Sequence, residues 1–233
     1  MTFPPKTATI PDSQPLVPAT VAAQIEALAL TPGRPLLIAD ADEVLFYFMR
    51  GLERFLDSRD LYFDWRSYAL YGNIRHRRDG SAMAAEDLHP LLQSFFAEAT
   101  ELLEPVEGAA AALAHLAGKT QIVVLSNVPL TSKDARARAL VRHGMDFPLI
   151  ANSGPKGPAV AALLERVQAR AAFIDDIPHN HTSVAKLAPV MHRLHFIADP
   201  RLAALLGRAP DCHHRVDTWD EIRDHVAALL IED

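Results

Sequence analysis

The chain has 233 residues, of which 49% are hydrophobic and 22% charged, and its formal net charge is −6. This size and composition suit one α/β domain with a small insert, and they lack the basic surface that nucleic-acid binding requires. A single cysteine excludes an intrachain disulfide, and no segment has the length of a membrane span or the pattern of a signal peptide. We therefore expect a cytoplasmic protein without a nucleic-acid or membrane partner.

The chain begins with a proline-rich segment, residues 1–18, which predicts an extended arm. A helical apolar spacing follows and ends at Pro32-Gly33. Residues 36–45 then place four apolar residues directly before Asp40 and Asp42, the pattern of a buried parallel strand that ends in two acids. Ligands of open α/β sheets bind at that edge, so the acids indicate either a cation site or a polar turn after a strand.

Residues 46–104 differ in composition from the rest of the chain. All four tyrosines lie there, and apolar residues recur at helical spacing near Phe48 and again near Phe95. We expect a small all-helical insert, a cap, placed directly after the acidic pair. Its basic loop carries Arg75, His76, Arg77 and Arg78, which form either a solvated turn or a contact for a second anionic group of a substrate. Tyr47, Tyr68 and Tyr71 are candidate walls of a pocket.

After Pro105 strands and helices alternate. Short apolar runs predict strands near residues 121–125, 147–150, 171–174 and 194–198, and helical patterns lie between them. Thr218 and Glu221 form a capping box that opens a C-terminal helix. This alternation predicts a Rossmann-like parallel sheet flanked by helices, built from residues 19–45 and 105–233.

Polar side chains follow three of the predicted strands, and a lysine precedes a helix. Ser126 and Asn127 end one strand, Asp175 and Asp176 end another, and Lys156 lies between them. Because the carboxyl ends of parallel strands meet at one edge of the sheet, we expect these residues to share a crevice with Asp40 and Asp42.

This order of motifs resembles the haloacid dehalogenase-like (HAD) superfamily, specifically its phosphatases with a cap of the first type. The residues that carry the resemblance are Asp40-x-Asp42-x-Val44-Leu45, Ser126 with Asn127, Lys156, and Asp175-Asp176, and it covers about residues 36–200. Glu43 stands where many members have glycine, which indicates an unusual backbone conformation there, and Gly157 stands where proline is common.

The resemblance implies a magnesium-dependent phosphatase that hydrolyses a small phosphorylated metabolite through an aspartyl-phosphate. Asp40 is then the nucleophile, and Asp42 is the general acid that protonates the leaving alcohol and later activates water. Ser126, Asn127 and Lys156 hold the phosphate. The residues implied to hold Mg²⁺ are Asp40, Asp42 through its backbone carbonyl, Asp175 and Asp176. In the cap, the candidates for substrate recognition are Arg75, His76, Arg77 and Tyr47.

Two other functions stay open at this point. A phosphotransferase or mutase of the same superfamily would differ only in using a second hydroxyl in place of water. A non-catalytic binding protein could keep the fold, although such a protein usually loses one of Asp40, Asp42, Lys156 or Asp175. Cys212-His213-His214 suggests zinc only weakly, because no second ligand pair stands at zinc spacing. The substrate and the oligomeric state are not given by the sequence.

Overall fold

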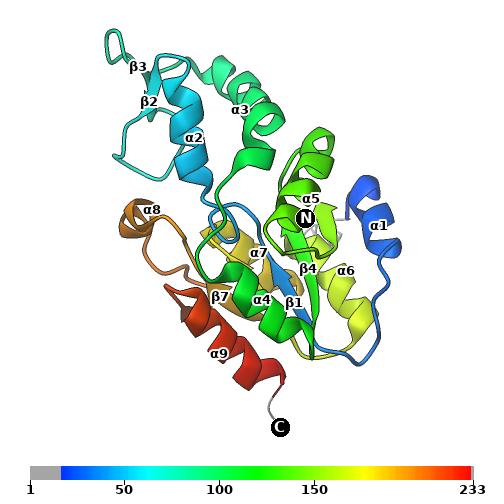
Figure 1. Ribbon diagram of the computed structural model, residues 1–233. Coiled ribbons are helices and arrows are strands. Elements are labelled where there is room, and N and C mark those ends of the chain that lie inside the picture. Colours follow the sequence, from blue (N-terminus) through cyan, green and yellow to red (C-terminus); the bar gives the residue numbers. More distant parts are fainter. Residues whose placement is uncertain (1–16, 232–233) are drawn as a thin grey trace, which may run out of the picture.

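The computed structural model describes residues 17–231, and its centre is a six-stranded parallel sheet (Figure 1). The strand order is β5-β4-β1-β6-β7-β8, with every neighbouring pair parallel. The strands are β1 (Leu36–Ala39), β4 (Gln121–Ser126), β5 (Leu149–Ala151), β6 (Ala171–Asp175), β7 (His192–His195) and β8 (His214–Arg215). The predicted α/β fold with a Rossmann-like parallel sheet is confirmed, whereas the predicted arm lies outside the described residues except for Val17 and Pro18.

Helices cover both faces of the sheet. Helices α1, α6 and α7 pack on one face, and α4, α5 and α9 pack on the other. The bounds of the core helices are α1 (Ala19–Glu26), α4 (Ala109–Ala117), η2 (Leu130–Ser132), α5 (Lys133–Arg142), α6 (Gly157–Val167), α7 (Pro178–Leu187), α8 (Pro200–Leu205) and α9 (Trp219–Leu230). The layers follow from the period of a strand: Leu36 and Ile38 of β1 face one apolar cluster, and Leu37 faces the other.

The insert that follows β1 is not all-helical, which corrects the prediction from the sequence. It contains α2 (Phe48–Asp57), β2 (Leu61–Phe63), β3 (Ile74–His76), α3 (Ala85–Ala99) and η1 (Thr100–Leu102). β2 and β3 pair antiparallel, with Leu61 opposite His76. Two three-residue strands are too short for apolar periodicity to distinguish from a loop, and the same brevity hid β8. The predicted boundaries of the insert, 46 and 104, stay a prediction.

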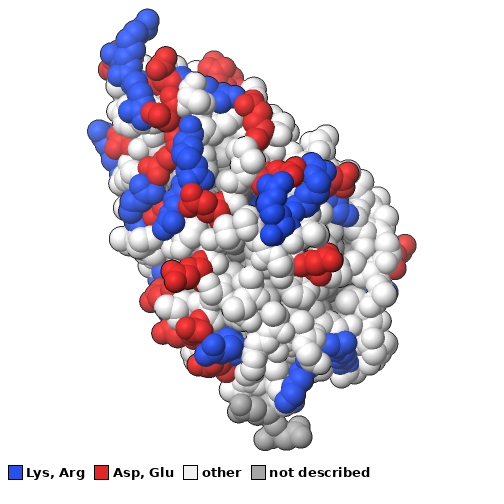
Figure 2. Space-filling model, viewed as in Figure 1, with Lys and Arg blue, Asp and Glu red and all other residues white. Residues whose placement is uncertain are grey.

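The two chain segments that join the cap to the core run side by side. Tyr47 N–H donates to the carbonyl of Glu104 at 2.9 Å, and Val106 N–H donates to the carbonyl of Leu45 at 2.8 Å. The cap lies above the carboxyl edge of the sheet (Figure 1), and charged side chains of both signs gather on it (Figure 2). This double connection places the cap over the ends of β1, β4 and β6.

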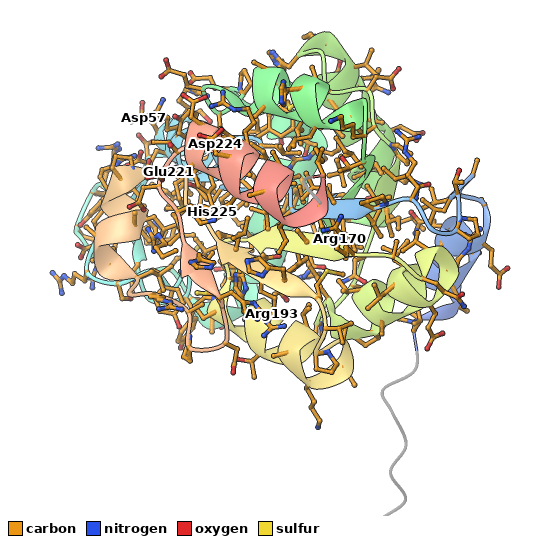
Figure 3. All side chains as sticks on the ribbon, turned by 90° about the horizontal axis from the view of Figure 1, so that it is seen from below. Asp57, Arg170, Arg193, Glu221, Asp224 and His225 are labelled. Carbon is orange, nitrogen blue, oxygen red and sulfur yellow. The ribbon has the colours of Figure 1, made fainter. Side chains whose placement is uncertain are left out.

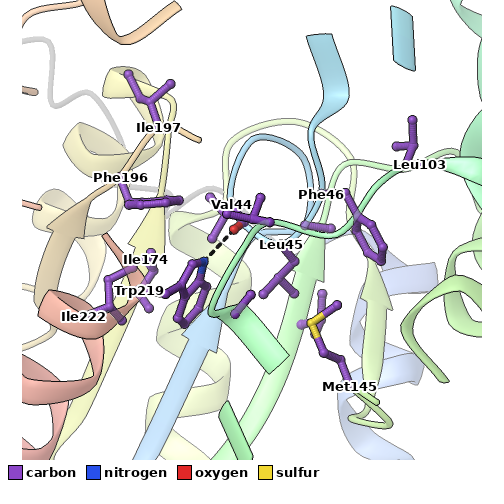
Figure 4. Packing of buried hydrophobic residues seen from close by; sticks show 14 of the residues in the cluster. Val44, Leu45, Phe46, Leu103, Met145, Ile174, Phe196, Ile197, Trp219 and Ile222 are labelled. Carbon is purple, nitrogen blue, oxygen red and sulfur yellow. Dashed lines mark hydrogen bonds between the residues drawn. The ribbon is translucent and has the colours of Figure 1, made fainter. Parts of the chain in front are cut away.

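The start of α9 fixes the segment that follows β1. Trp219 is buried, and its indole N–H donates to the carbonyl of Val44 at 2.9 Å, with Ile174 and Ile222 beside it (Figure 4). Val44 lies four residues beyond Asp40, so a C-terminal helix holds the loop that carries both acids of the first motif.

Candidate active site

The predicted crevice exists at the carboxyl ends of β1, β4 and β6. Asp40 follows β1 directly and is buried, and its backbone N–H donates to the carbonyl of Ile174 in β6. Oδ1 of Asp40 accepts a hydrogen bond from Ala41 N–H at 2.7 Å and pairs with Nζ of Lys156 at 2.7 Å. Its carboxylate is therefore held in one orientation by the turn after β1.

Lys156 contacts two of the four motif acids. Its Nζ lies 2.7 Å from Asp40 and 2.7 Å from Oδ2 of Asp175, and the side chain is fully buried. The lysine is the N-cap residue of α6, and the next residue, Gly157, packs against the backbone of Ser183 in α7 where a Cβ atom would overlap the Ser183 carbonyl. Glycine at this position thus permits the close approach of α6 to α7 that brings Lys156 to the acids.

Asp175 and Asp176 have different surroundings. Besides Lys156, Asp175 accepts hydrogen bonds from Ile177 N–H at 2.8 Å and from the side-chain amide of Asn180 at 3.0 and 3.2 Å. Asp176 instead lines the cavity between cap and core, together with Asp40 and Lys156. Asp175 is therefore the acid that orients Lys156, and Asp176 is the acid that faces the space where a ligand would lie.

Burial and neighbouring negative charges disfavour the ionised forms of Asp40 and Asp176. Burial raises the pKa of Asp40 to about 7, with Lys156 acting in the opposite direction and Asp175 adding to the rise. Burial and the charges of Asp175 and Asp40 raise the pKa of Asp176 well above its usual range. Burial alone would lower the pKa of Lys156, but the carboxylates of Asp175 and Asp40 hold it above its usual range. Three acids and one lysine form a site with an excess of negative charge.

The same group fits a cation. Asp40, Asp175 and Asp176 each offer a carboxylate oxygen, and these oxygens lie within 4.8 Å of one another. Oxygen donors suit a hard divalent ion such as Mg²⁺, and its charge would favour the ionised form of every acid that burial opposes. No other set of three such ligands lies together within residues 17–231, so the zinc alternative at Cys212-His213-His214 receives no support.

Ser126 and Asn127 lie at the rim that β4 contributes. Ser126 is buried, and its hydroxyl accepts a hydrogen bond from Val128 N–H at 3.3 Å, which leaves its own hydrogen free to donate. Asn127 lines the cavity, and its side chain donates to the carbonyl of Gly154 and accepts from Asn152. The fold thus brings both predicted phosphate ligands to the edge that carries Asp40.

Asp42 has a partner that the sequence analysis did not single out. Nη2 of Arg136 lies 2.5 Å from Oδ1 of Asp42, and the arginine side chain is fully buried above the ring of Phe46. Within residues 17–231 its Nε and Nη1 atoms have no hydrogen-bond partner. The spacing of apolar residues in the sequence indicates that Arg136 is buried. It shares a face of α5 with Ala139 and Leu140, three and four residues further on, and both are buried.

Glu43 adopts the left-handed conformation expected at this position, with φ of 56°. Its carboxylate is buried and accepts hydrogen bonds from Met49 N–H at 2.7 Å and from Asp199 N–H at 2.8 Å. Burial raises its pKa to about 7, although both hydrogen bonds act in the opposite direction. The strained backbone costs on the order of 1 kcal/mol, and these bonds tie the first turn of α2 to the loop before α8.

The cap residues predicted for substrate recognition are not brought to the acids. Arg75 pairs with Asp64, and Arg77 pairs with Asp57. Neither they nor His76 lines the cavity beside Asp40, and Tyr47 faces a separate hollow next to Trp219. The basic loop belongs to the β2–β3 hairpin, whose register sets these side chains outside the cavity. Tyr68 does line it, whereas Tyr71 does not.

The chain combines a parallel sheet, a buried cluster of carboxylates with a lysine at the carboxyl edge of that sheet, and an inserted cap. This combination can be compared with known proteins. No protein-family model and no curated protein sequence matches the chain. Solved structures do match. A HAD family hydrolase from Deinococcus radiodurans R1, with bound phosphate and sodium, gives a TM-score of 0.55 at 18% identity over 87% of this chain and 100% of that one.

Two further structures have similar scores. A predicted phosphatase from Clostridium acetobutylicum gives a TM-score of 0.56 at 13% identity over 84% of this chain and 100% of that one. A suggested beta-phosphoglucomutase from Thermotoga maritima gives 0.54 at 16% identity over the same shares. The chain therefore has the fold of the haloacid dehalogenase-like superfamily, and the resemblance drawn from the sequence is confirmed at the level of the fold.

None of the helices within residues 17–231 is both long enough and apolar enough to cross a membrane. The predicted cytoplasmic location itself stays a prediction.

Two histidines of β7, the buried His195 and the half-buried His192, predict loss of stability in acid. His195 accepts from Ala209 N–H and contacts the carbonyl of Asp176, so only its neutral ring satisfies both groups. Burial lowers its pKa from 6.5 to about 4, and burial and the stacked rings of His213 and His214 do the same for His192. The neighbouring His225 and Arg193 are visible in Figure 3.

As the pH falls, His192 and His195 take up a proton in the unfolded chain before they do so in the folded protein. The contribution of the two neutral rings to stability is therefore complete above pH 6.5 and is lost as the pH falls towards 4. We expect the free energy of unfolding, measured by urea titration at pH 7.5 and pH 5, to drop. His192→Gln should reduce that drop, and substitution of the exposed His89 should not. An equal drop in all three proteins would contradict the assignment.

Proposed function

We propose that this protein is a magnesium-dependent phosphatase that hydrolyses a small phosphate monoester through an aspartyl-phosphate on Asp40. The observation that carries the proposal is the contact of Lys156 with both Asp40 and Asp175 beside the cavity-lining Asp176. A structural neighbour of the same fold binds phosphate and sodium, which supports a site for an anion next to a cation.

Asp40 supplies the nucleophile. Its Oδ1 is held by Lys156 and by Ala41 N–H, so its second oxygen is the one left to attack phosphorus. The bond from phosphorus to the ester oxygen breaks as the bond to Asp40 forms, and water later cleaves the aspartyl-phosphate to release phosphate. Lys156, Ser126 and Asn127 would hold the non-bridging oxygens where negative charge accumulates.

Asp42 transfers the protons. In its protonated form it gives a proton to the departing alkoxide, and as a carboxylate it takes one from the water that attacks the aspartyl-phosphate. Arg136 anchors its carboxylate at the side of the cavity through the 2.5 Å contact. Water is the acceptor in this proposal because the cap residues that line the cavity are apolar apart from the hydroxyl of Tyr68, and provide few partners for a second alcohol substrate.

Asp40, the backbone carbonyl of Asp42, Asp175 and Asp176 would hold Mg²⁺, with Asp176 the better placed of the last two for direct contact. When bound, the ion offsets the charge of the acids and of the phosphate dianion. Without it the repulsion between Asp40 and the substrate remains.

Metal removal tests this proposal directly. We expect phosphate release from acetyl phosphate and p-nitrophenyl phosphate to fall to background after dialysis against EDTA and to return with Mg²⁺. Binding of Mg²⁺ should also raise the melting temperature of the wild-type protein, and less so that of Asp176→Asn. Full turnover in EDTA would contradict the metal requirement, and no turnover with any divalent ion would contradict the phosphatase proposal.

Arg136→Met is expected to separate positioning from folding. Methionine fills a similar apolar volume, so the protein should fold, while Asp42 loses its anchor. We expect kcat/KM to fall by roughly tenfold or more for an alkyl phosphate, which needs a placed acid, and by less for p-nitrophenyl phosphate. Arg138→Met, on the exposed side of the same helix and paired with Glu101, is the control. Equal losses on both substrates would argue against positioning.

A further inference from the structure

The cavity beside Asp40 has two unlike walls. It lies between the cap and the core, is partly open to solvent, and has a volume of about 240 Å³. The core wall carries the polar groups of the site, among them Asp40, Lys156 and Asp176. The cap wall consists of Phe48, Met49, Tyr68, Leu70 and Phe96. Among the described residues, no charged side chain of the cap reaches this space.

Three arginines of the cap pair with acids away from the cavity. Arg54 pairs with Glu104, Arg59 pairs with Glu98, and Arg75 pairs with Asp64. None of these arginines lines the cavity. Apart from the tyrosine hydroxyl, the cap thus offers neither a cation for a second acidic group nor a set of partners for several hydroxyls.

The core adds further apolar surface next to the acids. Ile177 and Leu202 line the cavity from the loop after β6 and from α8. Phe96 packs edge to face with Phe95 and contacts Phe48, so the aromatic part of the wall is held in place by its neighbours. A polyhydroxylated group buried against this apolar surface would give up hydrogen bonds to water without replacement there, which disfavours its binding.

Resting on the proposed function, we propose that the substrate is a phosphate monoester of an uncharged, predominantly apolar alcohol whose organic part is about the size of a single ring. The phosphate lies on the core wall and the organic part contacts the cap wall. A cavity of roughly 150 Å³ accommodates benzene, so the available space fits such a group beside the phosphate. Sugar phosphates and phosphorylated amino acids are disfavoured.

Esters of primary alcohols test this directly, because their leaving groups have comparable reactivity. We expect kcat/KM for benzyl phosphate to exceed that for glucose 6-phosphate and glycerol phosphate by roughly tenfold or more. Sugar phosphates cleaved as well as benzyl phosphate would overturn the inference. Acetyl phosphate, which has almost no organic part, reports on the core wall alone. Its hydrolysis without a preference for benzyl phosphate would overturn this inference only, whereas no hydrolysis of either would overturn the proposed function as well.

Two tyrosines of the cap provide a matched pair of variants. Tyr68 lines the cavity and is 52% exposed, whereas Tyr71 lies outside it and is 65% exposed, so neither substitution by alanine should impair folding. Tyr68→Ala and Leu70→Asn should each lower the ratio of kcat/KM for benzyl phosphate over glycerol phosphate by roughly threefold or more, mainly through KM. Tyr71→Ala should leave the ratio unchanged. The same ratio in all four proteins would overturn the assignment of the cap wall.

Discussion

Asp40→Asn is expected to abolish turnover while leaving the protein folded. The amide is a very poor nucleophile towards phosphorus, so we expect phosphate release to fall by at least about 10⁴-fold, as for loss of a covalent nucleophile elsewhere. An amide oxygen can still accept the hydrogen bond of Ala41 N–H, and Lys156 keeps Asp175, so the fold has no reason to fail.

The measurement is phosphate release from p-nitrophenyl phosphate, with the melting temperature as the control for folding. A second control is Asp40→Glu, which keeps the charge but moves the carboxylate by one methylene and should also be inactive. Wild-type turnover in Asp40→Asn would rule out an aspartyl-phosphate at this residue. Trapping of labelled phosphate on the wild type, and none on Asp40→Asn, would locate the covalent bond.

Asp42→Asn should divide the reaction into its two steps. The amide neither donates a proton to the leaving group nor accepts one from water, and general acid–base catalysis contributes about 10²–10⁴-fold. With an alkyl phosphate we expect a loss of that size in kcat/KM. With p-nitrophenyl phosphate, whose leaving group needs no acid, we expect one rapid equivalent of nitrophenol and then slow release of phosphate.

Stopped-flow absorbance gives the size of that burst, and quenched samples give the amount of phosphorylated protein. Because the amide oxygen introduced by Asp42→Asn would still accept a hydrogen bond from Arg136, the variant separates proton transfer from the contact itself. Unchanged steady-state turnover would remove the role proposed for Asp42. If the variant forms the phosphorylated protein as fast as the wild type does with both substrates, that role is limited to the second step.

Much of the core and of the motif acids could be predicted because each depends on a local pattern. Leu36 to Ala39 are all buried, and the acids after them follow the rule that polar residues end such a strand. The order of motifs along the chain then placed Lys156 near Asp175, although nothing in the spacing shows that one ammonium contacts two carboxylates.

What could not be predicted depends on contacts between distant segments. The carboxylate of Glu43 accepts a hydrogen bond from the backbone N–H of Asp199, and Arg136 contacts Asp42 from another helix. The charge of the basic loop leaves both a solvated turn and a substrate contact open, and pairing with Asp64 and Asp57 decides where Arg75 and Arg77 lie. Side-chain direction in a short hairpin follows from its register, which three-residue strands do not reveal.

The position of β1 in the middle of the sheet has a consequence for synthesis of the protein. Among residues 17–231 it is the first strand, but both of its partners, β4 and β6, are synthesised much later, and the cap is synthesised before either of them. Pairing over such sequence distances slows folding. The apolar segment from Leu36 to Ala39 therefore has no neighbouring strand to pair with during most of translation. We expect it to be the part of the nascent chain most in need of a chaperone.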